Sequence, residues 1–254
     1  MLDIAQIPVL RDNYLYLVRD PTTETVAAID PAVFDDTMRA LDQRGWHLTH
    51  ILNTHHHADH TGANLELKKA TGCQIVGPRA DAHRIPGIDV LVGDEDEVTL
   101  GGCVSKVFDV PGHTSGHICY WFADSNALFC GDTIFSIGCG RLFEGTPKQM
   151  WHSLKRLRSL PDDTLVFCAH EYTAANIAFA MTLEPEHPPL LQRAAEVKVL
   201  RAQNLPTVPS TIAKEKNANP FLRADDPRLQ SAIDMAGAQP VEVFAEIRRR
   251  KDIF

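Results

Sequence analysis

Long apolar runs, the residue pattern of a secretory leader and an excess of positive charge are not found among the residues of this sequence. No uninterrupted apolar stretch reaches the roughly 20 residues that cross a bilayer as a helix. Residues 1–6 lack the basic and then apolar pattern of a signal peptide. The net charge of −8 argues against a general phosphate-binding surface for nucleic acid. We therefore predict a cytoplasmic protein, taken as a monomer, that binds neither a membrane nor nucleic acid.

Paired cysteine motifs are missing as well. The six cysteines include no Cys-x-x-Cys pair and lie far apart, at positions 73, 103, 119, 130, 139 and 168. In a chain of 254 residues, this spacing argues against a disulfide framework and against a zinc ribbon. We expect most of these cysteines to be buried apolar thiols in a reducing cytoplasm.

The first two-thirds of the chain alternates short β-type runs with turns, which is typical of a mixed α/β domain. The expected strands are 14–18, 26–29, 50–53, 74–76, 104–110, 117–122, 127–130 and 165–168. Helices are expected at about 34–44 and 60–71. A third helix is expected to begin after Thr146, which can form a capping box with Gln149, and to end near Ser159.

After about residue 170 the sequence changes to long segments of helical periodicity. The expected helices are 174–183, 189–203, 227–235 and 241–250. Loops rich in proline, asparagine and threonine separate them, and the series of strands ends. We therefore predict an α/β domain over residues 1–170 and a smaller all-α domain over residues 171–254.

Residues 54–60 read Thr-His-His-His-Ala-Asp-His and directly follow an expected strand. In extended chain, alternate side chains point the same way, so His55 and His57 should share one side. Asp59 and His60 come where the chain turns into the next helix, offset from the first pair. One loop can therefore serve two adjacent metal ions. The alternative is a histidine-rich surface loop that binds metal adventitiously.

Three more residues of metal-binding type follow expected strands. His113 comes after 104–110, Asp132 after 127–130 and His170 after 165–168. Ligands placed at strand ends converge on one edge of a sheet, where a rigid scaffold presents its loops. A single ligand-type residue after a strand is weak support for a metal site. Four such strand ends, counting the one before the histidine-rich segment 54–60, together favour a metal centre.

These residues resemble the metallo-β-lactamase superfamily, and the chain is especially similar to its glyoxalase II branch, the hydroxyacylglutathione hydrolases. The superfamily pattern is His55-x-His57-x-Asp59-His60, with His113, Asp132 and His170 following in order. The branch is indicated by Pro111–His117, Gly131–Thr133, Gly138–Arg141, Glu144–Thr146, His170–Thr173, Asn219–Arg223 and the basic C-terminus. The resemblance covers nearly the whole chain. It implies an αββα sandwich followed by a smaller helical domain.

The resemblance also implies a binuclear metal centre. His55, His57 and His113 would hold one ion, Asp59, His60 and His170 the other, and Asp132 would bridge them. We expect two divalent ions, zinc first, with iron or manganese as alternatives. A water shared by the two ions would have a pKa lowered to about 7, giving hydroxide as the nucleophile. Asp59 and Asp132 are the residues to which the resemblance gives a catalytic role.

By resemblance, the substrate is an S-(2-hydroxyacyl)glutathione, with S-D-lactoylglutathione first. Its hydrolysis yields glutathione and D-lactate, a step of methylglyoxal detoxification. The glutathione carboxylate would be bound by Arg141, Tyr172, Arg248 and Lys251. Phe143 occupies a position where some relatives carry tyrosine, so one hydroxyl contact would be lost. The alternative for the basic run 248–251 is a solvated face of a C-terminal helix, where cations also favour the helix dipole.

Some neighbouring residues have two interpretations. Asp30 either orients a ligand imidazole, as carboxylates behind metal sites do, or caps a turn before Pro31. We expect His56 to face away from the metals and His117 to order its loop.

Rival functions are a mononuclear iron persulfide dioxygenase, a nucleic-acid phosphodiesterase and a non-catalytic metal-binding or thiol-sensing module. The long helical tail argues against the dioxygenase. The net charge of −8 argues against the phosphodiesterase, and the presence of all seven ligand-type residues argues against the non-catalytic module.

Overall fold

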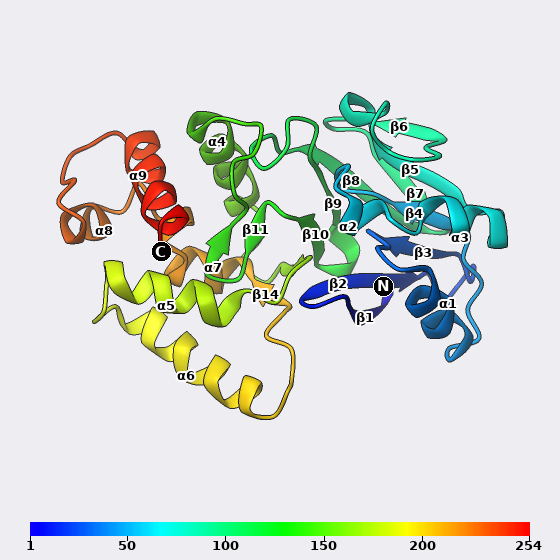
Figure 1. The fold of residues 1–254 in the computed structure, drawn as a ribbon, viewed down its shortest axis with the longest axis horizontal. Helices are drawn as coiled ribbons and strands as arrows, with labels where there is room; N and C mark the ends of the chain where they lie inside the picture. The colour runs from blue at the N-terminus through cyan, green and yellow to red at the C-terminus, as the bar shows by residue number, and fades with distance from the viewer. The chain divides into compact units, whose positions relative to one another are not determined.

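A computed structural model describes the whole chain, residues 1–254, which folds into two compact units (Figure 1). Unit 1 comprises Met1–Asp109 and Ser115–Gly131, and unit 2 comprises Val110–Thr114 and Asp132–Phe254. No helix is both long enough and apolar enough to cross a membrane.

Unit 1 contains a six-stranded sheet in the order β1-β2-β3-β4-β5-β6. Its strands are β1 (Asp3–Val9), β2 (Asn13–Arg19), β3 (Val26–Ile29), β4 (His50–Leu52), β5 (Gln74–Pro78) and β6 (Val90–Val92). The pairs β1–β2 and β2–β3 are antiparallel, whereas the pairs from β3 to β6 are parallel. Parallel neighbours need crossover connections, and helices lie in two of them: α1 (Phe34–Asp42) between β3 and β4, and α3 (Asn64–Thr71) between β4 and β5.

A second group of strands in unit 1 is antiparallel throughout and runs in the order β10-β9-β8-β7. Its strands are β7 (Glu97–Leu100), β8 (Cys103–Asp109), β9 (Ile118–Phe122) and β10 (Ala127–Gly131). Short 3₁₀ helices flank the two sheets at Arg79–Asp81 and Ala123–Ser125.

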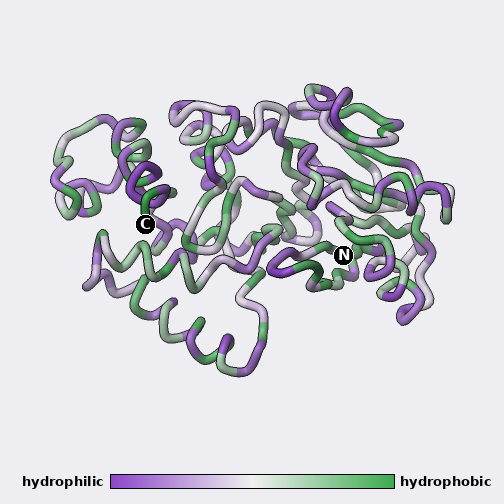
Figure 2. Tube along the Cα trace, in the orientation of Figure 1, coloured by the Kyte–Doolittle hydropathy of each residue, from purple (hydrophilic) through white to green (hydrophobic).

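The core of unit 1 follows from the two-residue period of its strands. Leu15 and Leu17 of β2 belong to an apolar cluster with Leu41 of α1 and Leu67 of α3. Tyr16, between them in sequence, points to the other face, where its ring lies 5.5 Å from that of Phe129 in β10. Unit 1 is therefore layered as helices, sheet and sheet. Figure 2 shows that hydrophobic and hydrophilic residues are interspersed along its trace.

Unit 2 is mainly helical. Its helices are α4 (Pro147–Arg158), α5 (Thr173–Leu183), α6 (Pro188–Ala202), α7 (Ile212–Ala218), α8 (Pro227–Ala232) and α9 (Pro240–Asp252), with a 3₁₀ turn at Pro220–Leu222. β13 (Leu165–Cys168) pairs antiparallel with the two-residue β14 (Ser210–Thr211). A hairpin of β11 (Ile134–Phe135) and β12 (Gly138–Cys139) completes the unit.

The second unit begins before residue 171 because the hairpin and α4 pack against the C-terminal helices. Ile137 of the hairpin belongs to an apolar cluster with Ile177 of α5 and Val197 of α6. The ring of Trp151 in α4 lies 6.4 Å from that of Phe244 in α9. Packing thus places Val110–Thr114 and residues 132–170 with the C-terminal helices, and a domain boundary between residues 170 and 171 stays a prediction.

The eight expected strands are all present, two of them with the expected bounds and the others with ends shifted by at most two residues. The capping box of α4 is confirmed, since Thr146 accepts from the Gln149 backbone and the Gln149 side chain accepts from the Thr146 backbone. The single helix expected at 60–71 is wrong: the structure has α2 (Ala58–Thr61) and then α3. The break lies at Gly62, where a Cβ would come within 2.6 Å of the Ala32 carbonyl oxygen. Sequence reasoning also missed α7, the seven-residue strand β1 and the shorter strands β6, β7, β11, β12 and β14.

Candidate functional site

The histidine-rich loop of unit 1 leaves the end of β4 and enters α2. His55 Nε2 and His57 Nδ1 lie 3.1 Å apart, so both rings present a nitrogen to the same point. His55 is fully buried, and His57 is partly exposed. The expected placement of these two side chains on one side is therefore confirmed. Asp59 and His60 follow in the first turn of α2, and Asp59 Oδ2 lies 3.6 Å from His60 Nε2.

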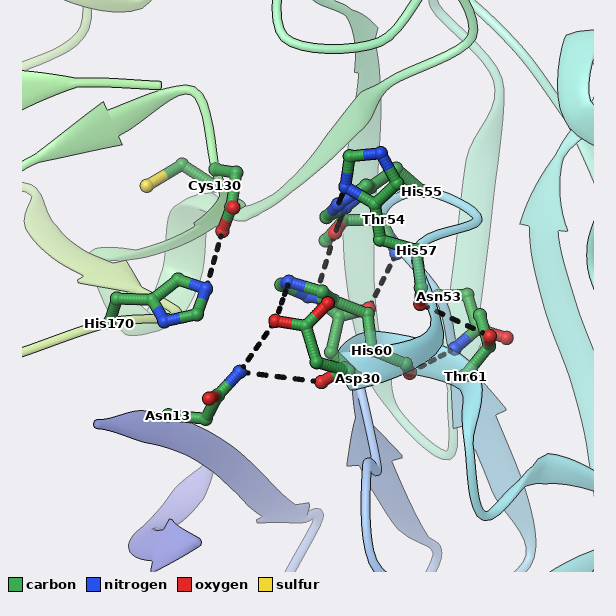
Figure 3. A network of polar contacts seen from close by, with 12 residues as sticks. Asn13, Asp30, Asn53, Thr54, His55, His57, His60, Thr61, Cys130 and His170 are labelled. Carbon is green, nitrogen blue, oxygen red and sulfur yellow. Dashed lines mark hydrogen bonds and ion pairs between the residues drawn. The ribbon is translucent and has the colours of Figure 1, made fainter. Parts of the chain in front are cut away.

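Asp30 holds this loop from below (Figure 3). Its Oδ1 accepts from the Thr54 backbone N–H at 2.8 Å, and its Oδ2 accepts from the Thr54 hydroxyl at 2.6 Å. The same Oδ2 lies 3.1 Å from His60 Nδ1. When Nδ1 of His60 carries the ring proton and donates it to Asp30, the lone pair of Nε2 is left available on the side of Asp59. This arrangement suits a metal ligand. Of the two interpretations of Asp30, the structure supports the orienting role.

Asparagines that sequence reasoning missed fix the backbone and one carboxylate of the loop. Asn53 Nδ2 donates to the His60 carbonyl at 3.0 Å, and its own carbonyl accepts from the Tyr120 hydroxyl at 2.9 Å. Asn13 Nδ2 donates to Asp59 Oδ2 at 2.9 Å. Asn53 could have been suspected because it lies directly between strand β4 and the histidine-rich segment. Asn13 carries no signal in the sequence, because its role depends on the pairing of distant strands.

The two histidines expected to be structural lie beside the ligand-type pair. His56 Nδ1 lies 3.0 Å from Oδ2 of the buried Asp81, whose Oδ1 accepts from Arg84 at 2.5 Å. The His117 ring stacks on that of His55, with centroids 4.6 Å apart and an interplanar angle of 19°. His117 is 1% exposed. Both positions agree with roles in ordering the loop.

Unit 2 contains a second cluster of ligand-type residues, centred on Asp132. Its Oδ2 lies 3.3 Å from His113 Nε2, and its Oδ1 lies 3.4 Å from His170 Nε2. One carboxylate thus presents a different oxygen to each imidazole, as a bridging ligand does. His113 Nδ1 lies 2.8 Å from the Arg141 carbonyl, which fixes the ring with Nε2 directed at Asp132. Gly140 is required here because a Cβ would collide with the Asp132 carbonyl.

Aromatic rings cover both histidines of this cluster. The Tyr172 ring stacks on His170 with centroids 4.7 Å apart and an interplanar angle of 4°. The ring of Phe143 meets that of His113 edge to face, with the ring centroids 5.2 Å apart, and Phe143 is 61% exposed. Two of the predicted substrate-binding residues therefore contact predicted metal ligands of the same unit.

The basic run at the end of α9, the purple turns near the C-terminus in Figure 2, divides into two kinds of residue. Arg249 and Arg250 both pair with Glu246 on the helix itself. Arg249 lies on a solvated face, whereas Arg250 is half-buried and also donates to the Ile233 carbonyl at 3.1 Å. Arg248 is 6% exposed; it donates to the Cys139 carbonyl at 3.1 Å and pairs with Asp252 at 2.9 Å.

Lys251 Nζ donates to the Ala175 carbonyl at 3.3 Å, and burial lowers the pKa of this lysine. Arg141 also approaches Asp252, with Nε 3.4 Å from Oδ1, and its side chain is 57% exposed. Arg141 and Arg248 are therefore gathered around one carboxylate, that of Asp252. Sequence reasoning did not single out Asp252.

The cysteines are unsuited to be ligands. All six are buried, as expected, and none forms a disulfide. Burial raises the pKa of Cys139 to about 11 and that of Cys168 to about 12, so both are thiols at neutral pH, whereas metals bind the thiolate. The donor set is imidazole nitrogen and carboxylate oxygen, which suits zinc, iron and manganese. These clusters indicate divalent metal binding.

Comparisons with known proteins agree along the whole chain. Residues 10–170 match the family model described as metallo-beta-lactamase superfamily, and residues 171–254 match the one described as hydroxyacylglutathione hydrolase C-terminus. The hydroxyacylglutathione hydrolase of Methylococcus capsulatus is 57% identical over 254 residues, covering 100% of this chain and 99% of the relative. That of Rhodospirillum rubrum is 57% identical over 253 residues, with the same coverage.

Solved structures show the same fold. ETHE1 from Myxococcus xanthus aligns with a TM-score of 0.70 at 28% identity, covering 97% of this chain and 90% of its own. TTHA1623, solved in a di-iron-bound form, aligns with a TM-score of 0.60 at 25% identity, covering 86% of this chain and 99% of its own.

Proposed function

Because this chain belongs to the hydroxyacylglutathione hydrolase family and has the metallo-β-lactamase fold followed by the helical domain of that family, we propose that it hydrolyses S-(2-hydroxyacyl)glutathione thioesters. The observation that carries the proposal is 57% identity to two hydroxyacylglutathione hydrolases over essentially the full length of both partners. S-D-lactoylglutathione is the proposed substrate, and glutathione and D-lactate are the products, in methylglyoxal detoxification. A cytoplasmic monomer without nucleic-acid or membrane partners belongs to the same proposal.

The proposed metal centre combines both clusters of ligand-type residues. His55, His57 and His113 would hold one divalent ion, Asp59, His60 and His170 the other, and Asp132 both. Support comes from the 3.1 Å between His55 and His57 nitrogens and from the two oxygens of Asp132, each directed at a different histidine. The di-iron form of TTHA1623 supports a count of two. Zinc is the first choice of metal, with iron or manganese as alternatives.

Two bound divalent ions would supply Lewis acidity and an activated water at neutral pH. The protein residues around them prepare that chemistry in advance. Asp30 and the Arg141 carbonyl each fix a ligand imidazole through its second nitrogen, and Asn13 orients Asp59. In the reaction, water adds to the thioester carbonyl and the C–S bond breaks. The glutathione sulfur leaves as a thiolate and therefore needs little help from a protonated side chain.

The proposed binding site for the glutathione carboxylate is built from unit 2. Arg141 offers a mostly exposed guanidinium, whose planar set of donors matches a carboxylate. Arg248 and Lys251 add positive charge, and Tyr172 adds a phenol beside His170. Phe143 lies on the His113 ring and has no hydroxyl, so it would offer only an apolar contact to the substrate.

The experiment that tests the function is hydrolysis of S-D-lactoylglutathione by purified protein, with metal analysis of the same sample. We expect rapid release of free thiol at about two metal ions per chain. A fully metallated protein that releases no thiol would contradict the proposal. Oxygen uptake on glutathione persulfide by protein with one iron would then support the persulfide dioxygenase alternative.

A further inference from the structure

The segment Asn-Pro-Phe-Leu-Arg at 219–223 matches the family pattern, yet none of its residues has a part in the proposed chemistry. In the structure it follows α7 and forms the 3₁₀ turn Pro220–Leu222. Within unit 2, this segment contacts two features on which the proposed substrate site depends. These are the β11–β12 hairpin and the guanidinium of Arg248.

Asn219 holds the hairpin by its backbone. Its Nδ2 lies 3.2 Å from the Phe135 carbonyl and 2.9 Å from the Gly138 carbonyl, one on each strand. The same Nδ2 lies 2.9 Å from Glu215 Oε2, which also accepts from the Ile137 backbone N–H at 2.8 Å. Both side chains are fully buried. The hairpin spans the sequence between Asp132 and Arg141, so these bonds fix the segment that joins a predicted metal ligand to a predicted substrate ligand.

Asn219 also sets the turn that carries Phe221, because its Oδ1 accepts from the Phe221 backbone N–H at 3.0 Å. The Phe221 ring is 1% exposed, and the Arg248 guanidinium lies 5.1 Å from its centroid. An aromatic face attracts a cation at this distance, more strongly where water is excluded. Arg248 in turn donates to the Cys139 carbonyl at the end of the hairpin. The motif therefore contacts both the hairpin and the cation that is bonded to the hairpin.

We propose that Asn219 and Phe221 are positioning residues for glutathione binding. Asn219 fixes the hairpin that leads to Arg141, and Phe221 fixes the plane of Arg248, so that the two guanidinium groups, which both face the Asp252 carboxylate, are held together where the substrate carboxylate would bind. Neither residue touches the substrate. This inference rests on the proposed function, because it assigns the motif to the glutathione end of the same site.

The test compares two buried phenylalanines of one cluster. Phe221 and Phe244 have ring centroids 5.9 Å apart, and both are essentially unexposed, but only Phe221 lies under Arg248. In Phe221→Leu we expect the KM for S-D-lactoylglutathione, and the inhibition constant of glutathione, to rise about threefold to tenfold, while kcat and metal content stay near those of the wild type. Phe244→Leu should lose similar stability without the rise in KM. Equal changes in KM in the two variants would overturn the proposal.

If the leucine variants do not fold, Phe221→Met and Phe244→Met fill the space with a more flexible side chain and are compared in the same way. Hydrogen exchange tests the role of Asn219. In Asn219→Ala, amide exchange over residues 134–140 should accelerate while α4 and α5 stay protected; uniform acceleration, or none, would count against positioning. A wild-type protein that hydrolyses no glutathione thioester would refute the proposed function instead, so the two failures are distinguishable.

Discussion

The two clusters of ligand-type residues, one in each unit, hold their histidines by different means. In unit 1 all four residues come from positions 55–60 of one loop, and a buried carboxylate, Asp30, holds the loop through both Thr54 and His60. In unit 2 the three residues come from three segments spread over 57 positions of the chain, with a backbone carbonyl behind His113 and a stacked tyrosine on His170. Local sequence can build the first cluster, whereas tertiary packing must build the second.

This difference has a consequence for mutation. The unit 1 cluster depends on a few side-chain hydrogen bonds that single substitutions can remove. In the unit 2 cluster His113 is held by the backbone carbonyl of Arg141, a contact that a side-chain substitution at position 141 does not remove. Asp132 is the exception, because its two oxygens are the shared feature of that cluster.

The largest expected effect is that of Asp132→Ala. Loss of the carboxylate that faces both histidines should lower kcat by at least about 100-fold to 1,000-fold. Removal of one electrostatic element of a catalytic site has an effect of this size. Metal content should fall as well, measured by elemental analysis beside thioester turnover. Near-normal activity with two metals still bound would refute the bridging assignment.

Asp30→Asn compared with Asp81→Asn tests the side-chain support of unit 1. Both carboxylates are buried, and each faces the Nδ1 of a loop histidine, His60 at 3.1 Å or His56 at 3.0 Å. Asparagine keeps the shape of the aspartate side chain, but its amide can place an N–H donor where the carboxylate oxygen accepted the hydrogen bond. We expect Asp30→Asn to lower metal affinity about 10-fold to 100-fold, measured by chelator competition.

Asp81→Asn should leave metal affinity unchanged, because His56 is not a predicted ligand. An equal loss in both variants would show that the loop responds as a whole and that His56 matters as much as His60.

Removing cations from unit 2 should act on binding. The double variant Arg141→Ala with Lys251→Ala should raise the KM for the glutathione thioester about tenfold, which corresponds to about 1.4 kcal/mol, and should lower kcat much less. The matched control is Arg249→Ala with Arg250→Ala, which removes the same charge from cations already paired with Glu246. An equal rise in the control would mean that overall charge, and not the predicted site, governs binding.

The smallest expected effects concern acid stability, where one buried carboxylate of each unit responds with opposite sign. Asp20 in unit 1 accepts from the Gly102 and Thr22 backbones and from the Thr23 hydroxyl, and these bonds lower its pKa to about 2. Since its folded pKa lies below the unfolded value, its contribution is present above about pH 4 and is lost as the pH falls toward 2. Asp20→Asn should therefore destabilise the protein at pH 5 more than at pH 2.5.

Burial raises the pKa of Glu215 in unit 2 above its ordinary value. The protonated form is then favoured by folding, so stability should decline as the pH rises from about 4.5 through the folded pKa. Glu215→Gln should flatten this part of the profile, measured by urea unfolding between pH 4 and pH 8. A slope unchanged in the variant would contradict the assignment.

Most strands of unit 1 were predictable because a two-residue alternation needs only neighbouring positions. The capping box at Thr146 was predictable for the same reason. The break between α2 and α3 was not, because there the Ala63 backbone N–H donates to the carbonyl of Pro31, a residue far earlier in the chain, instead of continuing the helix. Asn13 and Asp252 were missed likewise, since each acquires its role from a partner far away in sequence.

By itself, the sequence determined the ligand types, the spacing within the loop 55–60 and, through resemblance, the family. These are properties of residues that are near each other or that recur in a motif. Tertiary structure alone decided which carboxylate supports which histidine, that Arg248 is buried while Arg249 and Arg250 are not, and that Asn219 bonds both strands of the hairpin. The physical reason is that a buried polar group must find its partner wherever the fold brings one, and that choice is made by packing rather than by position in the chain.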